Sequence, residues 1–133
     1  EISRGIHPAI LSKGGLGPAI RTLARRSTVP VDLKLAIDGR LPEPVEVAAY
    51  YVVAEALTNV AKHAQASTVT VCASADHELR LVITDDGVGG AVAGGGSGLI
   101  GLKDRVEAIA GRLHVVSPAG NGTSLVVTIP LPA

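Results

Sequence analysis

Glycine is concentrated in one short segment of this chain, and that segment limits where regular structure can form. Eight of the 16 glycines lie between residues 87 and 101 of a chain of 133 residues. Because glycine loses more backbone entropy on folding than any other residue, such a segment is a poor helix or strand. The regular elements must come from the sequence on either side of it, and the segment itself must be a linker or a functional loop.

Hydrophobic periodicity on both sides of this segment predicts helices and strands. Residues 31–38 alternate apolar and polar side chains, and residues 68–75 and 78–84 are two β-branched runs that resemble a hairpin. The stretch 44–64 has no glycine, and no proline after Pro44, and it favours a helix of about five turns. The other predicted elements are a helix from about Pro18 after a break at Gly14 and Gly15, a helix at about 99–110 closed by Gly111, and strands at 113–117 and 124–131.

This order of elements predicts the fold class. One domain is expected from the length, and its core must be aliphatic because the chain has no Phe, Trp or Met. Helices and hairpins in this succession are typical of an α+β fold. We therefore expect a two-layer α/β sandwich, with helices on one face of a mixed, mostly antiparallel sheet.

Charge and cysteine content exclude several classes of function. The formal net charge is zero without basic clustering, so neither nucleic acid nor an anionic membrane is expected as a direct partner. Cys72 is the only cysteine, which indicates a reducing compartment such as the cytoplasm. No apolar stretch approaches the length of about 20 residues that spans a membrane. The chain begins at Glu1 rather than Met, which indicates a piece of a longer protein.

The long predicted helix carries the first cluster of candidate functional residues. Glu55, Asn59, Lys62 and His63 fall within an arc of about 100° on an ideal helical wheel. Their shared face adjoins the apolar face of the helix. A carboxylate, an amide and two basic groups would thus line an edge of the core. Taken alone, the same pattern also fits an ordinary surface ladder of charged side chains.

A second cluster, Asp85-Asp86-Gly87-Val88-Gly89, directly follows a predicted strand. Glycines spaced in this way let the backbone approach a ligand closely, while a carboxylate accepts a hydrogen bond from it. A plain Asp-Gly turn gives the same letters. A pair of acids of the glycosidase kind would need a further acid across a cleft, which the sequence leaves open.

The third cluster begins with Gly94, Gly96 and Gly98 and runs through Leu99 to Gly101 into a predicted helix. It contains G-x-G-x-x-G, but a dinucleotide-binding turn should lead directly from a strand into a helix, and here a glycine stretch precedes it. Glycines ahead of a helix N-terminus do expose N–H groups to phosphate. A flexible loop is the alternative. Near the C-terminus, Gly122 and Thr123 open the last predicted strand.

The order and context of these clusters resemble the histidine-kinase/gyrase-type ATP-binding domain, which has the Bergerat-type fold. From about residue 30 to 132 the chain is similar to the catalytic domain of a two-component sensor histidine kinase. Residues 55–63 look like its N box, residues 85–89 like its first glycine box, residues 96–102 like its second, and Gly122-Thr123 like its glycine-threonine element. The Lys62-His63 pair, the short lid without Phe and Gly101-Leu-Lys-Asp-Arg105 are similar to the branch typified by nitrate sensors.

The resemblance implies that Mg²⁺ and ATP are the bound species. Asp85 would accept a hydrogen bond from the adenine amino group, and Thr123 would support it through water. Gly87 and Gly89 would admit the purine. Residues 94–98 would form a lid over the phosphates, with Gly101 at the start of the helix.

The resemblance also implies the phosphate chemistry. Asn59 would hold Mg²⁺, and Glu55 would act as a base or polarise the attacking group. Lys62 and His63 would contact phosphate oxygens. Phosphoryl transfer needs mainly positioning and charge neutralisation, so these residue types suit it.

Partners and boundaries follow from the same resemblance. Residues 1–15 would be the C-terminal end of a dimerisation region and residues 16–133 the ATP-binding domain of a homodimeric parent kinase. The phosphoacceptor would be a histidine of an absent dimerisation domain rather than His7, because Pro8 indicates a helix end. A response regulator receiver domain would take the phosphoryl group. Two alternatives remain open: a protein serine kinase of the anti-sigma-factor type and a non-catalytic ATP-sensing module.

Overall fold

The computed structural model describes residues 14–64, 67–87, 97–116 and 122–132, and for residues 63–64 and 97–100 it describes the backbone alone. The elements are α2 (Leu16–Arg26), β1 (Val31–Ala36), α3 (Glu43–Asn59), the π-helical turn η1 (Val60–Ala64), β2 (Val69–Ala75), β3 (Glu78–Asp85), α4 (Ser97–Glu107), β4 (Arg112–Val116) and β5 (Thr123–Pro130).

The five strands form one mixed sheet in the order β1-β2-β3-β5-β4. β1 and β2 run parallel, and the other neighbours are antiparallel. The predicted hairpin is β2 and β3, and the predicted final pair of strands is β4 and β5. A parallel pair needs a long crossover connection, and here the connection from β1 to β2 contains α3 and η1.

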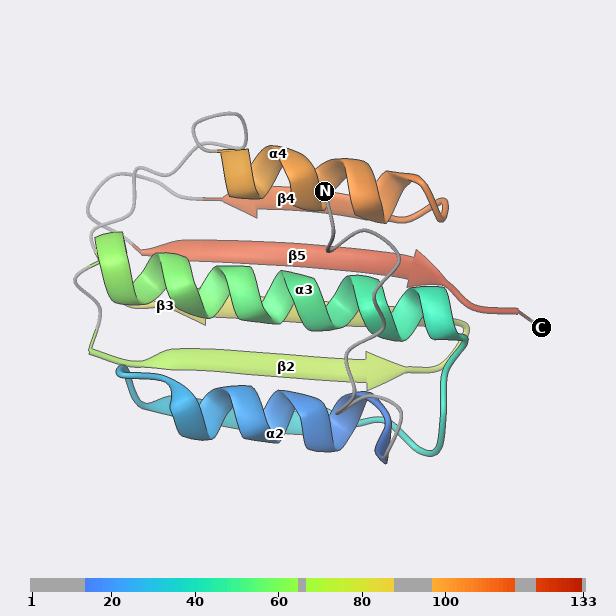
Figure 1. The fold of residues 1–133 in the computed structure, drawn as a ribbon, viewed down its shortest axis with the longest axis horizontal. Coiled ribbons are helices and arrows are strands. Elements are labelled where there is room, and N and C mark those ends of the chain that lie inside the picture. The colour runs from blue at the N-terminus through green and yellow to red at the C-terminus, as the bar shows by residue number, and fades with distance from the viewer. Residues whose placement is uncertain (1–13, 65–66, 88–96, 117–121, 133) are drawn as a thin grey trace, which may run out of the picture.

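The helices α2, α3 and α4 cover one face of this sheet (Figure 1). α2 packs on β1 and α3, and α4 packs on α3 and β4. The core between the layers consists only of Ala, Val, Leu and Ile side chains in the described part of the chain. Alternate strand residues supply it, since every second side chain of a strand faces the same side. The predicted α+β two-layer sandwich is confirmed.

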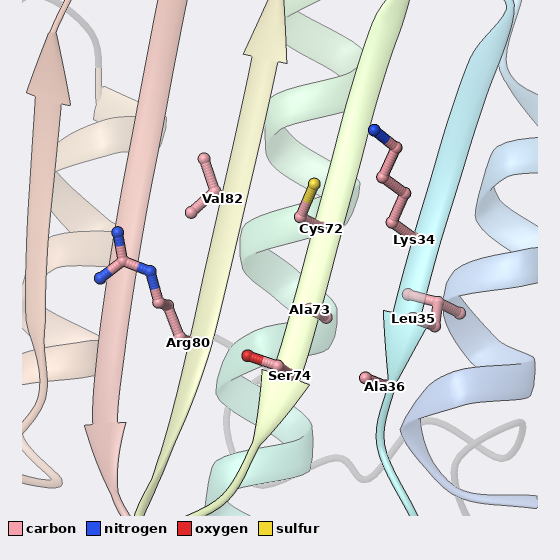
Figure 2. Close-up of a pocket in the computed structure, with 8 residues that line it drawn as sticks. All are labelled: Lys34, Leu35, Ala36, Cys72, Ala73, Ser74, Arg80 and Val82. Carbon is pink, nitrogen blue, oxygen red and sulfur yellow. The ribbon is translucent and has the colours of Figure 1, made fainter.

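In the described part of the chain no helix lies on the opposite face of the sheet, and this face carries more polar side chains (Figure 2). A shallow hollow of about 300 Å³ lies there between β1, β2 and β3. Cys72 and Val82 lie on its floor, and Lys34 and Arg80 extend from opposite sides of it. This hollow therefore lies on the side of the sheet away from α2, α3 and α4.

The first described helix starts two residues earlier than predicted. α2 begins at Leu16, and Gly15 precedes it with a φ of 84°. A Cβ on Gly15 would lie 2.8 Å from Cδ of Arg40 and 3.2 Å from Oε2 of Glu46. Glu46 is fully buried at the start of α3, where it accepts hydrogen bonds from Nε and Nη2 of Arg40 and from the Leu41 N–H. The entry to α2 thus lies close against this ion pair at the entry to α3.

The end of α4 differs in detail from the prediction. The left-handed residue there is Ala110, with a φ of 65°, and not Gly111. The Gly111 N–H donates to the Val106 carbonyl and the Ala110 N–H to the Glu107 carbonyl, which is the bond pattern of a Schellman motif. Gly111 is required for space, because a Cβ there would lie 2.7 Å from Cγ1 of Val106 and 2.8 Å from the Thr128 carbonyl oxygen.

Candidate functional site

Asp85 is a buried carboxylate at the end of a strand. It is the last residue of β3, it lies on the helix-covered face of the sheet, and it is 7% exposed. Its Oδ1 accepts a hydrogen bond of 2.8 Å from the Gly87 N–H, which closes a tight turn. No described residue donates to Oδ2. Buried polar atoms normally have a partner, and a carboxylate oxygen is an acceptor.

Thr123 and Gly122 lie beside Asp85 on the next strand. Thr123 opens β5 and is the direct cross-strand neighbour of Asp85, on the same face of the sheet. Gly122 has a φ of 77°, and a Cβ there would overlap the Asp85 carbonyl oxygen and lie 3.2 Å from its carbonyl carbon. The glycine-threonine element therefore packs directly against the residue that we expect to contact adenine.

The N-box residues lie at the end of α3. Asn59 is its last residue and Glu55 lies one turn earlier, and both are half-buried at the edge of the core-facing side. This placement agrees with the wheel derived from the sequence. The helix then continues as the π-helical turn η1, with Lys62 exposed and the side chain of His63 outside the described residues. The ideal 3.6-residue wheel was therefore wrong for residues 60–64, because a π turn rotates successive residues by a smaller angle.

The second glycine box begins α4. The helix starts at Ser97, so Gly98 and Leu99 lie in its first turn and Gly101 is its fifth residue. The helix therefore starts two residues before the predicted residue 99 and four before Gly101, whereas the role of residues 94–98 as a lid stays a prediction. Helix boundaries are weakly encoded where glycines precede the first turn. Gly89, Gly94 and Gly96 lie outside the described residues.

These segments meet at one end of the molecule. α3 and β3 end there, and β5 and α4 begin there, on the left in Figure 1. Asp85 and Thr123 lie on the sheet side of this end, whereas Asn59 and the first turn of α4 lie on the helix side. The two layers thus bring a buried acceptor, a hydroxyl, an amide and a helix N-terminus to the same edge of the sandwich.

Asp86 is a further residue of this site, and its role is not evident from the sequence pattern. Its Oδ1 accepts hydrogen bonds from the N–H groups of Ser67 (2.8 Å) and Thr68 (3.0 Å), and its Oδ2 accepts one from the Ser67 hydroxyl. The Ser67 hydroxyl, and then the amides of Thr68 and Ser67, lower the pKa of Asp86 to about 2. The pair Asp85-Asp86 after the strand was the only sequence feature that pointed to Asp86. The sequence could not reveal its role, because its hydrogen-bond partners lie 18 and 19 residues away.

Within the described ranges, no group of three or more His, Cys, Asp or Glu side chains could hold a metal ion. A metal at this site would depend on Asn59 and on ligands that the nucleotide and water supply. Among the same residues, none of the helices combines the length and apolar character that a membrane crossing requires.

Comparison with known proteins identifies the family. The profile of the family described as Histidine kinase-, DNA gyrase B-, and HSP90-like ATPase matches residues 45–133. The sensor histidine kinase NarS of Mycobacterium tuberculosis is 36% identical over 95% of this chain and 32% of its own length. The nitrate/nitrite sensor protein NarX of Escherichia coli is 31% identical over 89% of this chain and 21% of its own length. The chain thus spans a third or less of these two relatives.

A solved structure agrees with this family. The histidine kinase domain of the blue-light activated histidine kinase of Erythrobacter litoralis superposes with a TM-score of 0.67 at 25% identity, over 85% of this chain and 56% of that one. The chain therefore belongs to the histidine kinase-, DNA gyrase B- and HSP90-like ATPase family, and within it is an ATP-binding catalytic domain of the histidine-kinase type, with nitrate-sensor proteins among its relatives.

Proposed function

We propose that this domain binds Mg-ATP and transfers the γ-phosphoryl group to a histidine of a dimerisation domain in its parent kinase. One observation carries the proposal. Asp85 presents a buried carboxylate oxygen, without a described donor, at the edge where α3 and α4 meet the sheet. A buried acceptor at such an edge suits the exocyclic amino group of adenine, which is a hydrogen-bond donor.

The adenine half of the site would consist of Asp85, Thr123 and the backbone at Gly87. Asp85 would accept from the adenine amino group, and the neighbouring Thr123 would act through a bridging water. Gly87 is buried, and its N–H donates to Asp85. Because glycine has no side chain, a purine could approach the backbone closely at this position. In the same proposal Gly89 would admit the base, although it lies outside the described residues.

The phosphate half would consist of Asn59, Glu55, Lys62, His63 and the start of α4. Mg²⁺ prefers oxygen ligands, keeps several waters and leans on substrate phosphates, so a single amide oxygen from Asn59 fits it. When bound, Mg²⁺ would neutralise charge on the phosphates. The exposed Lys62 would contact a phosphate oxygen, and so would His63. The N–H groups of the first turn of α4, including those of Gly98 and Leu99, suit an anion.

In the transfer step, a ring nitrogen of the acceptor histidine attacks the γ-phosphorus, the bond to the bridging oxygen breaks, and ADP leaves. Glu55 would accept a proton from the imidazole or polarise it. The relatives named above are sensor histidine kinases, which favours a histidine over a serine as the acceptor. A receiver domain of a response regulator would then accept the phosphoryl group.

The position of the domain in its parent is part of the proposal. Residues 1–15 would end the dimerisation region, and residues 16–133 would form the catalytic domain. The start of α2 at Leu16 and its packing on α3 support this boundary. The parent would be a homodimer with this domain in the cytoplasm.

The test is a transfer assay with a separately supplied dimerisation domain. With γ-labelled ATP and Mg²⁺, the wild-type domain should label that partner with an acid-labile, base-stable phosphohistidine. Asn59→Ala should abolish most labelling while retaining nucleotide binding. An acid-stable phosphoserine, or equal labelling by Asn59→Ala, would contradict the proposal.

A further inference from the structure

Asp86 joins two segments that belong to different halves of the site. Ser67 and Thr68 lie between η1, which carries Lys62, and the start of β2. The Asp86 carboxylate accepts from both of their N–H groups and from the Ser67 hydroxyl. The Asp86 N–H in turn donates to the Thr68 carbonyl at 3.4 Å. Four hydrogen bonds therefore hold residues 67–68 against the end of β3.

The same contacts determine where Asp85 lies. The peptide after Asp85 is held on one side by the bond between the Asp86 N–H and Thr68, and Gly122 packs on the other side against the Asp85 carbonyl. The next residue, Gly87, supplies the only described hydrogen bond to the Asp85 carboxylate. A rotation of the Asp86 backbone would turn the Gly87 N–H and release the Asp85 side chain from its orientation.

We propose that Asp86 is the positioning residue that orients Asp85 for adenine and aligns it with the segment leaving the N box. This inference rests on the proposed function, because it assigns adenine recognition to Asp85. Asp86 itself is exposed and points toward residues 67–68, so it contacts protein and not nucleotide. Its low pKa means that the carboxylate remains ionised, and thus a strong acceptor, throughout the neutral range.

The experiment compares the affinities of the folded domain for ATP and for GTP, in the presence of Mg²⁺. Asp86→Ala removes all three side-chain bonds, whereas Asp86→Asn retains an oxygen for the two N–H groups and an amide for the Ser67 hydroxyl. Asp76→Ala is the matched control, because Asp76 is an exposed aspartate in the turn at the other end of β2 and β3. Circular dichroism and urea unfolding establish that each variant is folded at the assay temperature.

We expect Asp86→Ala to lower the ratio of ATP affinity to GTP affinity by about tenfold, the loss of one charge-assisted hydrogen bond at the base. Asp86→Asn should restore most of the ratio, and Asp76→Ala should leave it unchanged. A merely structural role would reduce both affinities equally, since partial unfolding does not distinguish the bases. If Asp86→Ala does not fold, Ser67→Ala removes the hydroxyl bond alone and should still lower the ratio.

The outcomes separate this inference from the proposed function. If the wild-type domain binds neither nucleotide, the proposed function fails. If the wild type prefers ATP and folded Asp86→Ala or Ser67→Ala keeps the wild-type ratio, the positioning role of Asp86 is overturned while ATP binding stands.

Discussion

The tightest contact in the adenine half is that of Gly122 with the backbone of Asp85, and Gly122→Ala tests it. Two costs arise from one methyl group. The backbone has a φ of 77°, where an L-residue costs about 1–2 kcal/mol more than glycine. The new Cβ would also overlap the Asp85 carbonyl oxygen, and that oxygen belongs to the backbone and cannot rotate away. Forcing such a shift in a packed region costs about 1–3 kcal/mol.

Gly39→Ala separates the two costs. Gly39 has a φ of 75°, and a Cβ there would have no atom within 4 Å. It lies in the loop from β1 to α3, at the opposite end of the sheet (Figure 1). Gly39→Ala should therefore lower the free energy of unfolding by about 1–2 kcal/mol, and Gly122→Ala by about 2–5 kcal/mol.

Urea unfolding measures both variants, and calorimetric titration of ATP measures the functional consequence. Gly122→Ala should also weaken ATP binding because Asp85 moves, whereas Gly39→Ala should leave it unchanged. If Gly122→Ala is no less stable than Gly39→Ala and binds ATP as well as the wild type, the close packing of Gly122 on Asp85 is refuted.

Three further predictions concern stability, pH and metal. Glu46→Ala removes a fully buried acceptor of the Leu41 N–H and should lower the free energy of unfolding in urea by about 1–3 kcal/mol. Lys103→Ala breaks an exposed ion pair with Glu107 and should lower it by less than about 0.5 kcal/mol. Equal losses in the two variants would contradict this contrast. The folded pKa of Asp86 is about 2, below the ordinary aspartate value, so its stabilisation is present above about pH 4 and is lost as the pH falls toward 2. The urea midpoints of the wild type and Asp86→Asn should therefore converge over that range, and a constant gap would count against the assignment. Chelation of Mg²⁺ should weaken ATP binding to the wild type but change little in Asn59→Ala, as titration with and without EDTA would show; equal weakening would remove Asn59 from the metal site.

The sandwich could be predicted because its elements are encoded locally. The alternation in residues 31–38 matches β1, the β-branched run at 78–84 matches β3, and the predicted helix at 44–64 matches α3 and η1. Asp85 could be found in the same way, because it follows a strand and precedes spaced glycines. These elements and the position of Asp85 depend on residues that are close in the sequence, and hydrophobic periodicity reveals such local patterns.

The details that depend on distant contacts could not be predicted. The role of Asp86 comes from Ser67 and Thr68 across the sheet, and the buried Glu46 depends on Arg40 in the preceding loop. The π-helical turn at residues 60–64 has no sequence periodicity that announces it, so an ideal helical wheel did not predict it. The left-handed conformation of Ala110 also depends on a packing contact. The Val106 side chain leaves no room for a Cβ at position 111, so glycine occupies that position and Ala110 takes the positive φ.

Adenine recognition by Asp85 is central to the proposed site, and calorimetric titration of Mg-ATP into matched variants tests it most directly. Asp85→Ala should lose detectable ATP binding, while Asp76→Ala, which removes an exposed aspartate from the other end of β3, should bind as the wild type does. Equal ATP affinity in the wild type and in folded Asp85→Ala would contradict adenine recognition by Asp85.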